Sequence, residues 1–373
     1  MMPKEAIHYK DSVRYDSLDR FGRNALKVFS STWRNPNKFG IKLLEESVGE
    51  TAQVFDVEVN GKTIRLAKNA EVLGTKIIVA VEMSKTDRKN TRKYFRGIGQ
   101  DTANMSINDV LAVGSQPFSY SSVICVGDNN FLDNLDISGG ICDGILQAAN
   151  DSKAIAAGGE TAKLDGVIIP KQADLSGSSS GIINPKERFC HGGRVEAGNI
   201  LYGIIVNTPC SNGITSIRKI AERMPHGYFT ELPSGELFGE AVLKPTPSFS
   251  PVVTTLFDAR IPINYMQPIT GHGFKKIARS RKNLTYVLDN LPDMPEIFQF
   301  IQKQQNIGNK EMAETYNCGL GYAIFTEKED DRIYSLAKEK GMEIVKIGYV
   351  EKGPKRIIAN SWGFEFSNED LVA

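Results

Sequence analysis

The chain has 373 residues, of which 41% are hydrophobic and 24% charged, as in an ordinary globular protein. Lys and Arg total 45 against 44 Asp and Glu, and the resulting net charge of +1 argues against nucleic-acid binding because it offers no broad field for a polyanion. Single cores stop growing at roughly 250–300 residues, so we expect two domains.

Cysteine usage and hydropathy predict a cytoplasmic protein without a membrane partner. The five cysteines are scattered and lack the short spacing of a zinc site or a redox pair, which favours reduced thiols. The opening Met1–Ala6 is polar and has no signal-peptide core. The longest apolar run, Ile77–Val81, is far too short to cross a membrane.

The first elements along the chain are predicted from hydrophobic patterning. The initial 50 or so residues are polar and indicate an extended arm with a helix or two. Alternating apolar and polar residues over Asp56–Leu66, with Asn60-Gly61 at the centre, predict a β-hairpin. The mostly apolar segment Thr75–Met83 is predicted as a strand, and Asp101–Val113 has helical spacing.

Strands and helices continue to alternate through the middle of the chain. We expect a strand at Ser121–Val126, a helix at Asn134–Asn150 and a strand at Ala154–Ala157 that ends in a turn at Gly158-Gly159. A serine-rich stretch at 176–181 precedes the turn-rich segment Asn184–Asn199, where we place a domain boundary.

The second half, like the first, is predicted to combine strands with helices. Its predicted elements are a strand at Ile200–Val206, helices at Ile214–Met224 and Pro251–Asp258, and a strand at Ile344–Val350. Helices alternating with strands favour α/β layering in two domains, 1–186 and 187–373.

The predicted helix from Asp101 carries the first candidate site. Asp101, Asn104 and Asn108 recur three and four residues apart, so a helix places them on one face, with Asp109 beside it. Carboxylate and amide oxygens suit Mg²⁺, and phosphates can complete its coordination. In isolation the pattern more often marks a solvated helix face with an N-terminal Asp cap.

Three glycine-containing turns offer further candidates. Gly158-Gly159-Glu160-Thr161 follows a short strand, where the backbone can approach a ligand closely. Ser211-Asn212-Gly213 supplies N-cap residues before a helix whose free amides attract phosphate. In Thr270-Gly271-His272-Gly273, the histidine could contact substrate or carry a proton. Each segment by itself also fits an ordinary turn, a capped helix or a surface histidine.

The order of these motifs resembles one enzyme family along nearly the whole chain. The matching segments are Tyr9-Lys10-Asp11, Leu73-Gly74-Thr75-Lys76, Ile98-Gly99-Gln100-Asp101 with Asn108-Asp109, Gly158-Gly159-Glu160-Thr161-Ala162, Ser211-Asn212-Gly213 with Arg218-Lys219, Lys244-Pro245-Thr246, Thr270-Gly271 with Gly273-Phe274, and Tyr316–Gly321. Together they are similar to the aminoimidazole ribonucleotide synthetases, also called phosphoribosylformylglycinamidine cyclo-ligases.

The resemblance implies two α/β domains and a homodimer whose N-terminal strands and helices build a shared barrel, followed by a C-terminal α/β sandwich. It implies ATP and Mg²⁺ in a cleft between the domains. There, phosphorylation of an amide oxygen on a small phosphorylated substrate would allow an amine of the same molecule to close the imidazole ring.

Site roles follow from the same resemblance. Asp101 and Glu71 are expected metal ligands, and Asp101, Asn108 and His272 are the catalytic candidates. Cofactor binding is expected at Glu71, Gly74, Thr75, Lys76, Asp109, Gly158, Gly159, Glu160 and Thr161. Substrate binding is expected at Ser211, Asn212, Gly213, Thr270, Gly271 and Gly273.

Three departures from the family pattern keep other functions open. Glu71 stands where the family has Asp, Asn35–Lys42 replaces a glycine-rich loop, and Cys210 replaces a frequent histidine. The alternatives are a small-molecule kinase or synthetase of the same superfamily with another substrate, and a non-catalytic nucleotide-binding homologue.

Overall fold

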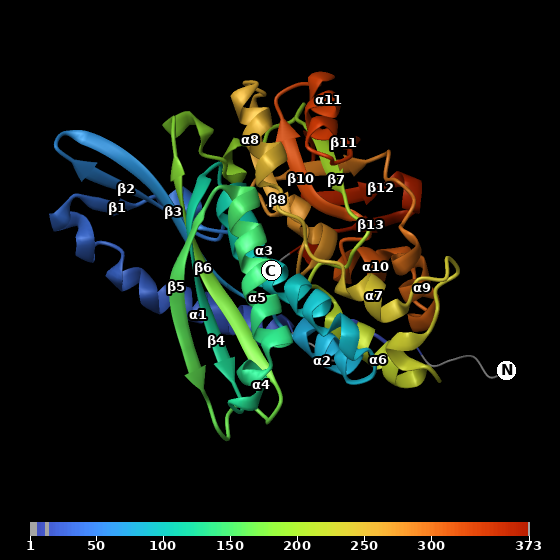
Figure 1. Cartoon of the computed structure of the whole chain (residues 1–373). Helices are drawn as coiled ribbons and strands as arrows, with labels where there is room; N and C mark the ends of the chain where they lie inside the picture. The colour runs from blue at the N-terminus through green and yellow to red at the C-terminus, as the bar shows by residue number, and fades with distance from the viewer. Residues whose placement is uncertain (1–5, 12–14, 372–373) are drawn as a thin grey trace.

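The computed structural model describes residues 6–11 and 15–371, so the polar opening Met1–Ala6 lies outside the described residues except for Ala6. In this part of the chain the strands form two sheets, each accompanied by helices (Figure 1). The largest apolar cluster nevertheless contains residues from both halves, from Leu73 and Ile77 to Phe325 and Phe366. The predicted α/β architecture is confirmed, with one continuous core joining its two parts.

The N-terminal sheet has six strands in the order β1-β2-β3-β6-β4-β5. All neighbours are antiparallel except β4 and β5, which are parallel. The strands are β1 (Ile41–Leu43), β2 (Gln53–Val59), β3 (Lys62–Val72), β4 (Gln116–Val126), β5 (Ile155–Lys163) and β6 (Ala173–Ile183). This sheet is open within one chain, so the shared barrel remains a prediction.

The helices of this half are α1 (Tyr15–Phe29), α2 (Lys76–Thr86), α3 (Thr91–Ala112), α4 (Asn130–Asp133) and α5 (Leu135–Ser152). The helices α3 and α5 lie between the N-terminal sheet and the C-terminal half (Figure 1). Helix α3 is buried along most of its length because it contacts the sheet on one side and the C-terminal half on the other.

The predicted hairpin is confirmed. Strands β2 and β3 pair from Val59↔Lys62 onward, and both Asn60 and Gly61 adopt positive φ, as a type I′ turn requires. The serine-rich stretch lies within β6, a central strand, where alternate residues are buried. Small side chains suit this position because β6 packs between two neighbours and against α3.

The predicted strand at Thr75–Met83 is wrong, because residues Lys76–Thr86 form helix α2. The chain leaves β3 through Leu73 and Gly74, which has a φ of +76°, and then turns into the helix. Most of the apolar residues of α2 are buried, so they show no helical periodicity and their β-branched run resembles a strand. Tertiary packing therefore overrides the local preference.

The predicted turn at Gly158-Gly159 is also wrong, because β5 continues through it to Lys163. Gly159 pairs with Ser122 of β4, and a Cβ there would lie 1.8 Å from the Ser122 carbonyl oxygen. Here glycine permits close approach of two strands instead of a sharp bend.

The C-terminal sheet has seven strands in the order β13-β12-β9-β11-β7-β10-β8. Its neighbours are antiparallel except β12 and β9. The strands are β7 (Ile200–Ile205), β8 (Ile263–Pro268), β9 (Leu284–Leu288), β10 (Leu320–Thr326), β11 (Ile344–Lys352), β12 (Arg356–Ala359) and β13 (Phe364–Phe366).

The helices of this half are α6 (Ile214–Arg223), α7 (Phe238–Leu243), α8 (Ser250–Asp258), α9 (Glu296–Gln305), α10 (Asn309–Thr315) and α11 (Arg332–Glu339). The predicted strands at the positions of β7 and β11 and the predicted helices at α6 and α8 are confirmed. The first sheet ends at Ile183 and the second begins at Ile200, and the proposed boundary at 186/187 falls between them. Across the described residues, each helix is too short or too polar to span a bilayer.

Candidate active site

The polar face of α3 holds a segment of the C-terminal half. The Asn104 side-chain amide donates to the carbonyl oxygen of Thr246 over 2.8 Å. The Asn108 amide donates to the carbonyl of Pro247 over 3.0 Å, and its oxygen accepts from the backbone N–H of Phe249 over 3.0 Å. The two asparagines thus satisfy backbone groups of residues 246–249 and fix that segment against the helix.

Asp101 lies one helical turn before Asn104 and is fully buried. Its Oδ1 accepts from the backbone N–H and the hydroxyl of Thr246, over 2.7 and 2.6 Å. Its Oδ2 lies 2.7 Å from the equally buried Lys76 ammonium, as an ion pair without an aligned hydrogen bond. Lys76 in turn donates to the carbonyl of Lys244 over 2.8 Å. The pair therefore joins α2, α3 and the C-terminal half.

A second group of charges gathers around the next turn of α3. Burial raises the pKa of Asp109 well above its ordinary value, and the nearby negative charge and hydrogen bond of Glu71 raise it further. Burial lowers the pKa of Lys276, while Asp109 and Glu71 act in the opposite direction. The Lys276 ammonium also donates to the Thr270 hydroxyl. Two carboxyl groups thus share a site that faces a lysine from the other half of the chain.

Asp109 and Thr270 border a cavity of about 10 Å³ at the junction of the two halves. Such a volume holds one water molecule at most, so a nucleotide needs the two halves or their side chains to move apart. Four of the sequence motifs contribute to its lining, through Asn108 and Asp109, Thr246, Thr270, and Gly321. The other lining residues are Asn104, Met105, Cys210, Phe249, Pro268 and Ile269.

The donor set fits a magnesium ion held partly by phosphates. Among the described residues there is no cluster of three or more His, Cys, Asp or Glu side chains, so no complete protein cage exists. Mg²⁺ commonly takes one or two carboxylates and completes its shell with phosphate and water. Glu71 and Asp109 provide such a pair, and a cation would offset the burial and the Glu71 charge that raise the pKa of Asp109.

The edge strand β5 stands apart from this cavity. The expected cofactor residues Gly158, Gly159, Glu160 and Thr161 are exposed there, and none of them lines the cavity. The Glu160 carboxylate accepts from the neighbouring Thr161 N–H over 3.1 Å. Their predicted role in cofactor binding remains a prediction.

The start of α6 differs from the expected cap. Gly213, with a φ of +69°, is the N-cap residue, and neither Ser211 nor Asn212 caps the helix. Gly213 packs so closely on Tyr316 that a Cβ would lie 2.1 Å from its ring. The Ser211 hydroxyl and the Asn212 side-chain nitrogen are buried without a hydrogen-bond partner among the described residues. Both groups remain available to a ligand beside Cys210.

The segment Thr270–Gly273 turns beneath helix α1. His272 has a φ of +67°, and its Nε2 lies 3.7 Å from an Asp19 oxygen of that helix. Burial lowers the pKa of His272, partly offset by the negative charge of Asp19. Gly273 is required because a Cβ would lie 2.1 Å from the Ala313 carbonyl oxygen.

Two charged residues with buried partners, Lys276 and Glu50, are not among the site residues predicted from the sequence. Glu50 accepts from the Gly192 N–H over 2.8 Å and from the Tyr265 hydroxyl over 3.1 Å, and burial raises its pKa. Only the tertiary contacts reveal both roles, since each residue lies far along the chain from its partners.

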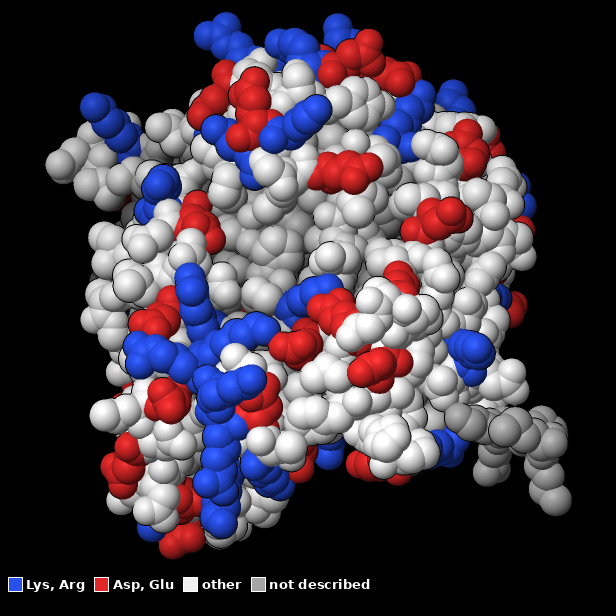
Figure 2. All heavy atoms as spheres, turned by 45° about the vertical axis from the view of Figure 1, so that its right-hand side comes forward, with Lys and Arg blue, Asp and Glu red and all other residues white. Residues whose placement is uncertain are grey.

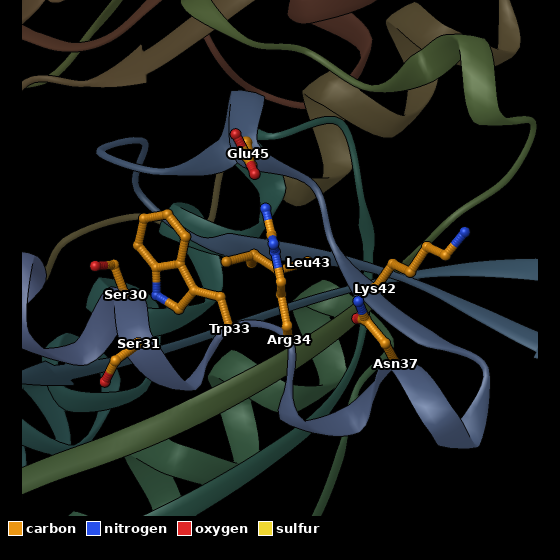
Figure 3. Close-up of a pocket in the computed structure, with 8 residues that line it drawn as sticks. All are labelled: Ser30, Ser31, Trp33, Arg34, Asn37, Lys42, Leu43 and Glu45. Carbon is orange, nitrogen blue, oxygen red and sulfur yellow. The ribbon is translucent and has the colours of Figure 1, made fainter.

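Where the resemblance expects a glycine-rich loop, the chain forms a polar pocket of about 500 Å³ (Figure 3). The Arg34 side chain points toward Glu45, the Trp33 indole lies beside it, and the Lys42 side chain extends away from both (Figure 3). The lining residues are Ser30, Ser31, Trp33, Arg34, Asn37, Lys42, Leu43 and Glu45. Charged side chains therefore line the region where the resemblance led us to expect a glycine-rich loop.

Comparisons with known proteins agree with the order of the motifs. Residues 49–183 match the family described as AIR synthase related protein, N-terminal domain. The phosphoribosylformylglycinamidine cyclo-ligase of Methanobrevibacter smithii is 31% identical over 284 residues, covering 74% of this chain and 77% of the relative. That of Neisseria meningitidis is 28% identical over 353 residues, covering 93% and 96%.

Solved structures share the fold at low sequence identity. Hydrogenase maturation protein HypE in complex with ATP has a TM-score of 0.57 at 15% identity, covering 83% of this chain and 85% of its own. The structure titled AaThiL complexed with AMPPCP and TMP has a TM-score of 0.55 at 14% identity, covering 86% and 90%.

Proposed function

The chain belongs to the phosphoribosylformylglycinamidine cyclo-ligase family, and we propose that it closes the imidazole ring of aminoimidazole ribonucleotide in purine biosynthesis, at the expense of ATP. The observation that carries this proposal is the meeting of family motifs from both halves of the chain around one cavity. Asn104, Asn108 and Asp109 come from α3, whereas Thr246 and Thr270 come from the C-terminal half.

The reaction needs one phosphoryl transfer and one ring closure. The γ-phosphoryl group of ATP moves to the amide oxygen of formylglycinamidine ribonucleotide, which releases ADP and turns that oxygen into a leaving group. An amine nitrogen of the same substrate attacks the activated carbon, the C–O bond breaks, and phosphate departs. The main tasks of the protein are to orient the two reacting parts and to stabilise charge on the phosphates.

We assign metal binding to Glu71 and Asp109, whose carboxyl groups already share one site. Mg²⁺ at this position would neutralise charge on the transferred phosphoryl group. Lys276 faces the same carboxylates. Its ammonium group would pair with the negative charge of phosphate when the cleft opens. Asp101 and Asn108 act as positioning residues, since their polar atoms hold residues 246–249.

Substrate phosphate is assigned to the turn before α6. Ser211 and Asn212 retain unpartnered polar atoms there, and the backbone amides at the start of α6 attract anions. We assign Thr270, Gly271 and Gly273 to the facing part of the cleft, on the support that Thr270 lines the cavity, whereas His272 is directed toward α1. Figure 2 shows charges of both signs on one face of the molecule, and the net charge of +1 gives no broad basic field for nucleic acid.

Homodimerisation in the cytoplasm completes the proposal. Several strands of the N-terminal sheet expose apolar side chains, with Val72 56%, Phe118 40% and Ile155 66% exposed. A second copy would remove these side chains from water. Pairing of the two N-terminal sheets would also bring the exposed strand β5, with Glu160 and Thr161, into an interface.

The decisive experiment measures phosphate release from ATP with and without formylglycinamidine ribonucleotide, in the presence of Mg²⁺. We expect release to depend on the substrate and to be lost in Asp109→Asn. The matched control is Asp133→Asn, which changes an exposed carboxylate of α4 far from the cavity lining and should retain activity. ATP binding without stimulated release would instead support another substrate or a non-catalytic homologue.

A further inference from the structure

A second cavity lies at the opposite end of α3 from the domain cleft. Its volume is about 480 Å³, within the range of small-molecule sites. It is bordered by Thr91 and Phe95 at the start of α3, whereas the cleft uses Asn104 to Asp109. Asn104 follows Phe95 by nine positions, which corresponds to about 13.5 Å along a helix. The two cavities are therefore distinct.

The floor of this second cavity is apolar. Phe95 and Phe131 are buried and pack edge to face, with ring centroids 5.8 Å apart. Val81 of α2 and Ile137 of α5 are partly buried and complete the floor. A hollow of this size lined by aromatic and branched side chains favours a ligand with an apolar body.

The rim of the cavity is mainly cationic. Lys85, Arg88 and Lys171 line it against a single acidic residue, Asp136. Lys85 pairs with Glu82 over 2.7 Å, but neither Arg88 nor Lys171 forms an ion pair within the described part of the chain. Lys171 adopts a φ of +62°, a conformation unfavourable for lysine, and its backbone N–H donates to Asp128. Two cations without an ion-pair partner among the described residues thus lie at this opening, together with the Asp136 carboxylate.

Ser84 supplies a polar atom between floor and rim. Its hydroxyl lines the cavity and is buried, yet it has no hydrogen-bond partner among the described residues. A buried hydroxyl without a partner is costly, and a ligand acceptor entering the cavity would satisfy it.

We propose that this cavity is a second ligand site for a small amphipathic anion, with an aromatic or branched apolar body and one phosphate or carboxylate group. The apolar body would cover Phe95 and Phe131, and the anionic group would lie between Arg88 and Lys171. Ser84 would donate a hydrogen bond to the same ligand. This assignment is independent of the reaction proposed for the domain cleft.

The test is calorimetric titration of the full-length protein with phenyl phosphate and with benzoate. Two control compounds are titrated in the same way. Inorganic phosphate carries only the anionic group, and benzyl alcohol carries only the aromatic body. We expect at least one amphipathic anion to bind about tenfold more tightly than either control compound. The better of the two probes identifies the head group. If neither phenyl phosphate nor benzoate binds more tightly than the two control compounds, the proposal is overturned.

Variants locate the binding. The double variant Arg88→Gln/Lys171→Gln should lower the affinity for the preferred probe by about tenfold or more, because charge-assisted hydrogen bonds are lost. Ser84→Ala should weaken it by a smaller factor. Lys89→Gln is the matched control, because Lys89 belongs to the same turn as Arg88 but does not line this cavity. Equal affinity in the double variant and the control would disprove the site.

Saturating ATP separates this site from the cleft. Probe affinity should be unchanged when ATP is bound. Direct competition between the probe and ATP would place the probe in the cleft and overturn the proposal. Neither result bears on substrate-stimulated phosphate release, so this site and the proposed reaction can fail separately.

Discussion

The Lys76–Asp101 pair shows how one buried contact changes the role expected for a residue. Both side chains are completely buried, and Asp101 also binds Thr246. An exposed aspartate on a helix face would be free to bind a metal. Here the same residue neutralises a buried lysine, so its main role is to stabilise the association of the two halves.

Replacing Asp101 by Asn should therefore destabilise the protein by about 3–5 kcal/mol, because Lys76 is left buried without a charged partner. The free energy of unfolding in urea measures this effect. The double variant Lys76→Met/Asp101→Asn should recover most of the loss, since it removes both charges. If Asp101→Asn is as stable as the wild type, Asp101 is not needed to neutralise Lys76 and can again be considered a metal ligand.

Glu50 should make stability depend on pH. Burial raises its pKa above the ordinary value, although Gly192, Tyr265 and two arginines oppose the shift. The folded state therefore holds this proton more tightly than the unfolded state, and the resulting stabilisation is lost as pH rises through the folded-state pKa. Unfolding of the wild type and Glu50→Gln, compared from pH 4 upward, isolates this contribution. Parallel pH profiles for the two proteins would exclude it.

At the scale of elements, helices α3 and α5 approach closely through glycines on both. A Cβ at Gly99 would lie 2.2 Å from the Ile141 carbonyl oxygen, and one at Gly144 would lie 2.0 Å from that of Arg96. These contacts are with backbone atoms, which cannot move aside as the end of a flexible side chain can. The close approach positions α3, and with it the residues that border both cavities.

Gly144→Ala should accordingly cost about 1–3 kcal/mol by overpacking this contact. Gly22→Ala is the matched control, because Gly22 is also helical but a Cβ there would meet nothing within 4 Å. The control should be neutral or stabilising by about 0.4–1 kcal/mol. Thermal or urea unfolding of both variants measures the difference, and equal stability would show that the helices can separate without penalty.

At the scale of the whole molecule, the exposed apolar residues of the N-terminal sheet predict a dimer. Ile155 lies on the edge strand β5 and is 66% exposed. Ile155→Lys should shift the protein toward the monomer in sedimentation velocity experiments, because a like charge from each copy would enter the interface. Leu146→Lys is a control on the exposed surface of α5. A monomeric wild type would refute the dimer outright.

The sequence determined the α/β class, the helices α6 and α8 and the strands β7 and β11 of the second half, and the family, because these depend on local patterning and on the order of motifs. It also predicted the β2–β3 hairpin, since Asn60-Gly61 encodes its turn directly. Only the tertiary structure decided that Lys76–Thr86 is a helix and that Gly158-Gly159 remains in a strand, because burial and strand pairing override local preference there. It likewise decided that Asp101 pairs with Lys76 while Asp109 meets Glu71 and Lys276, since these contacts join residues distant in the chain.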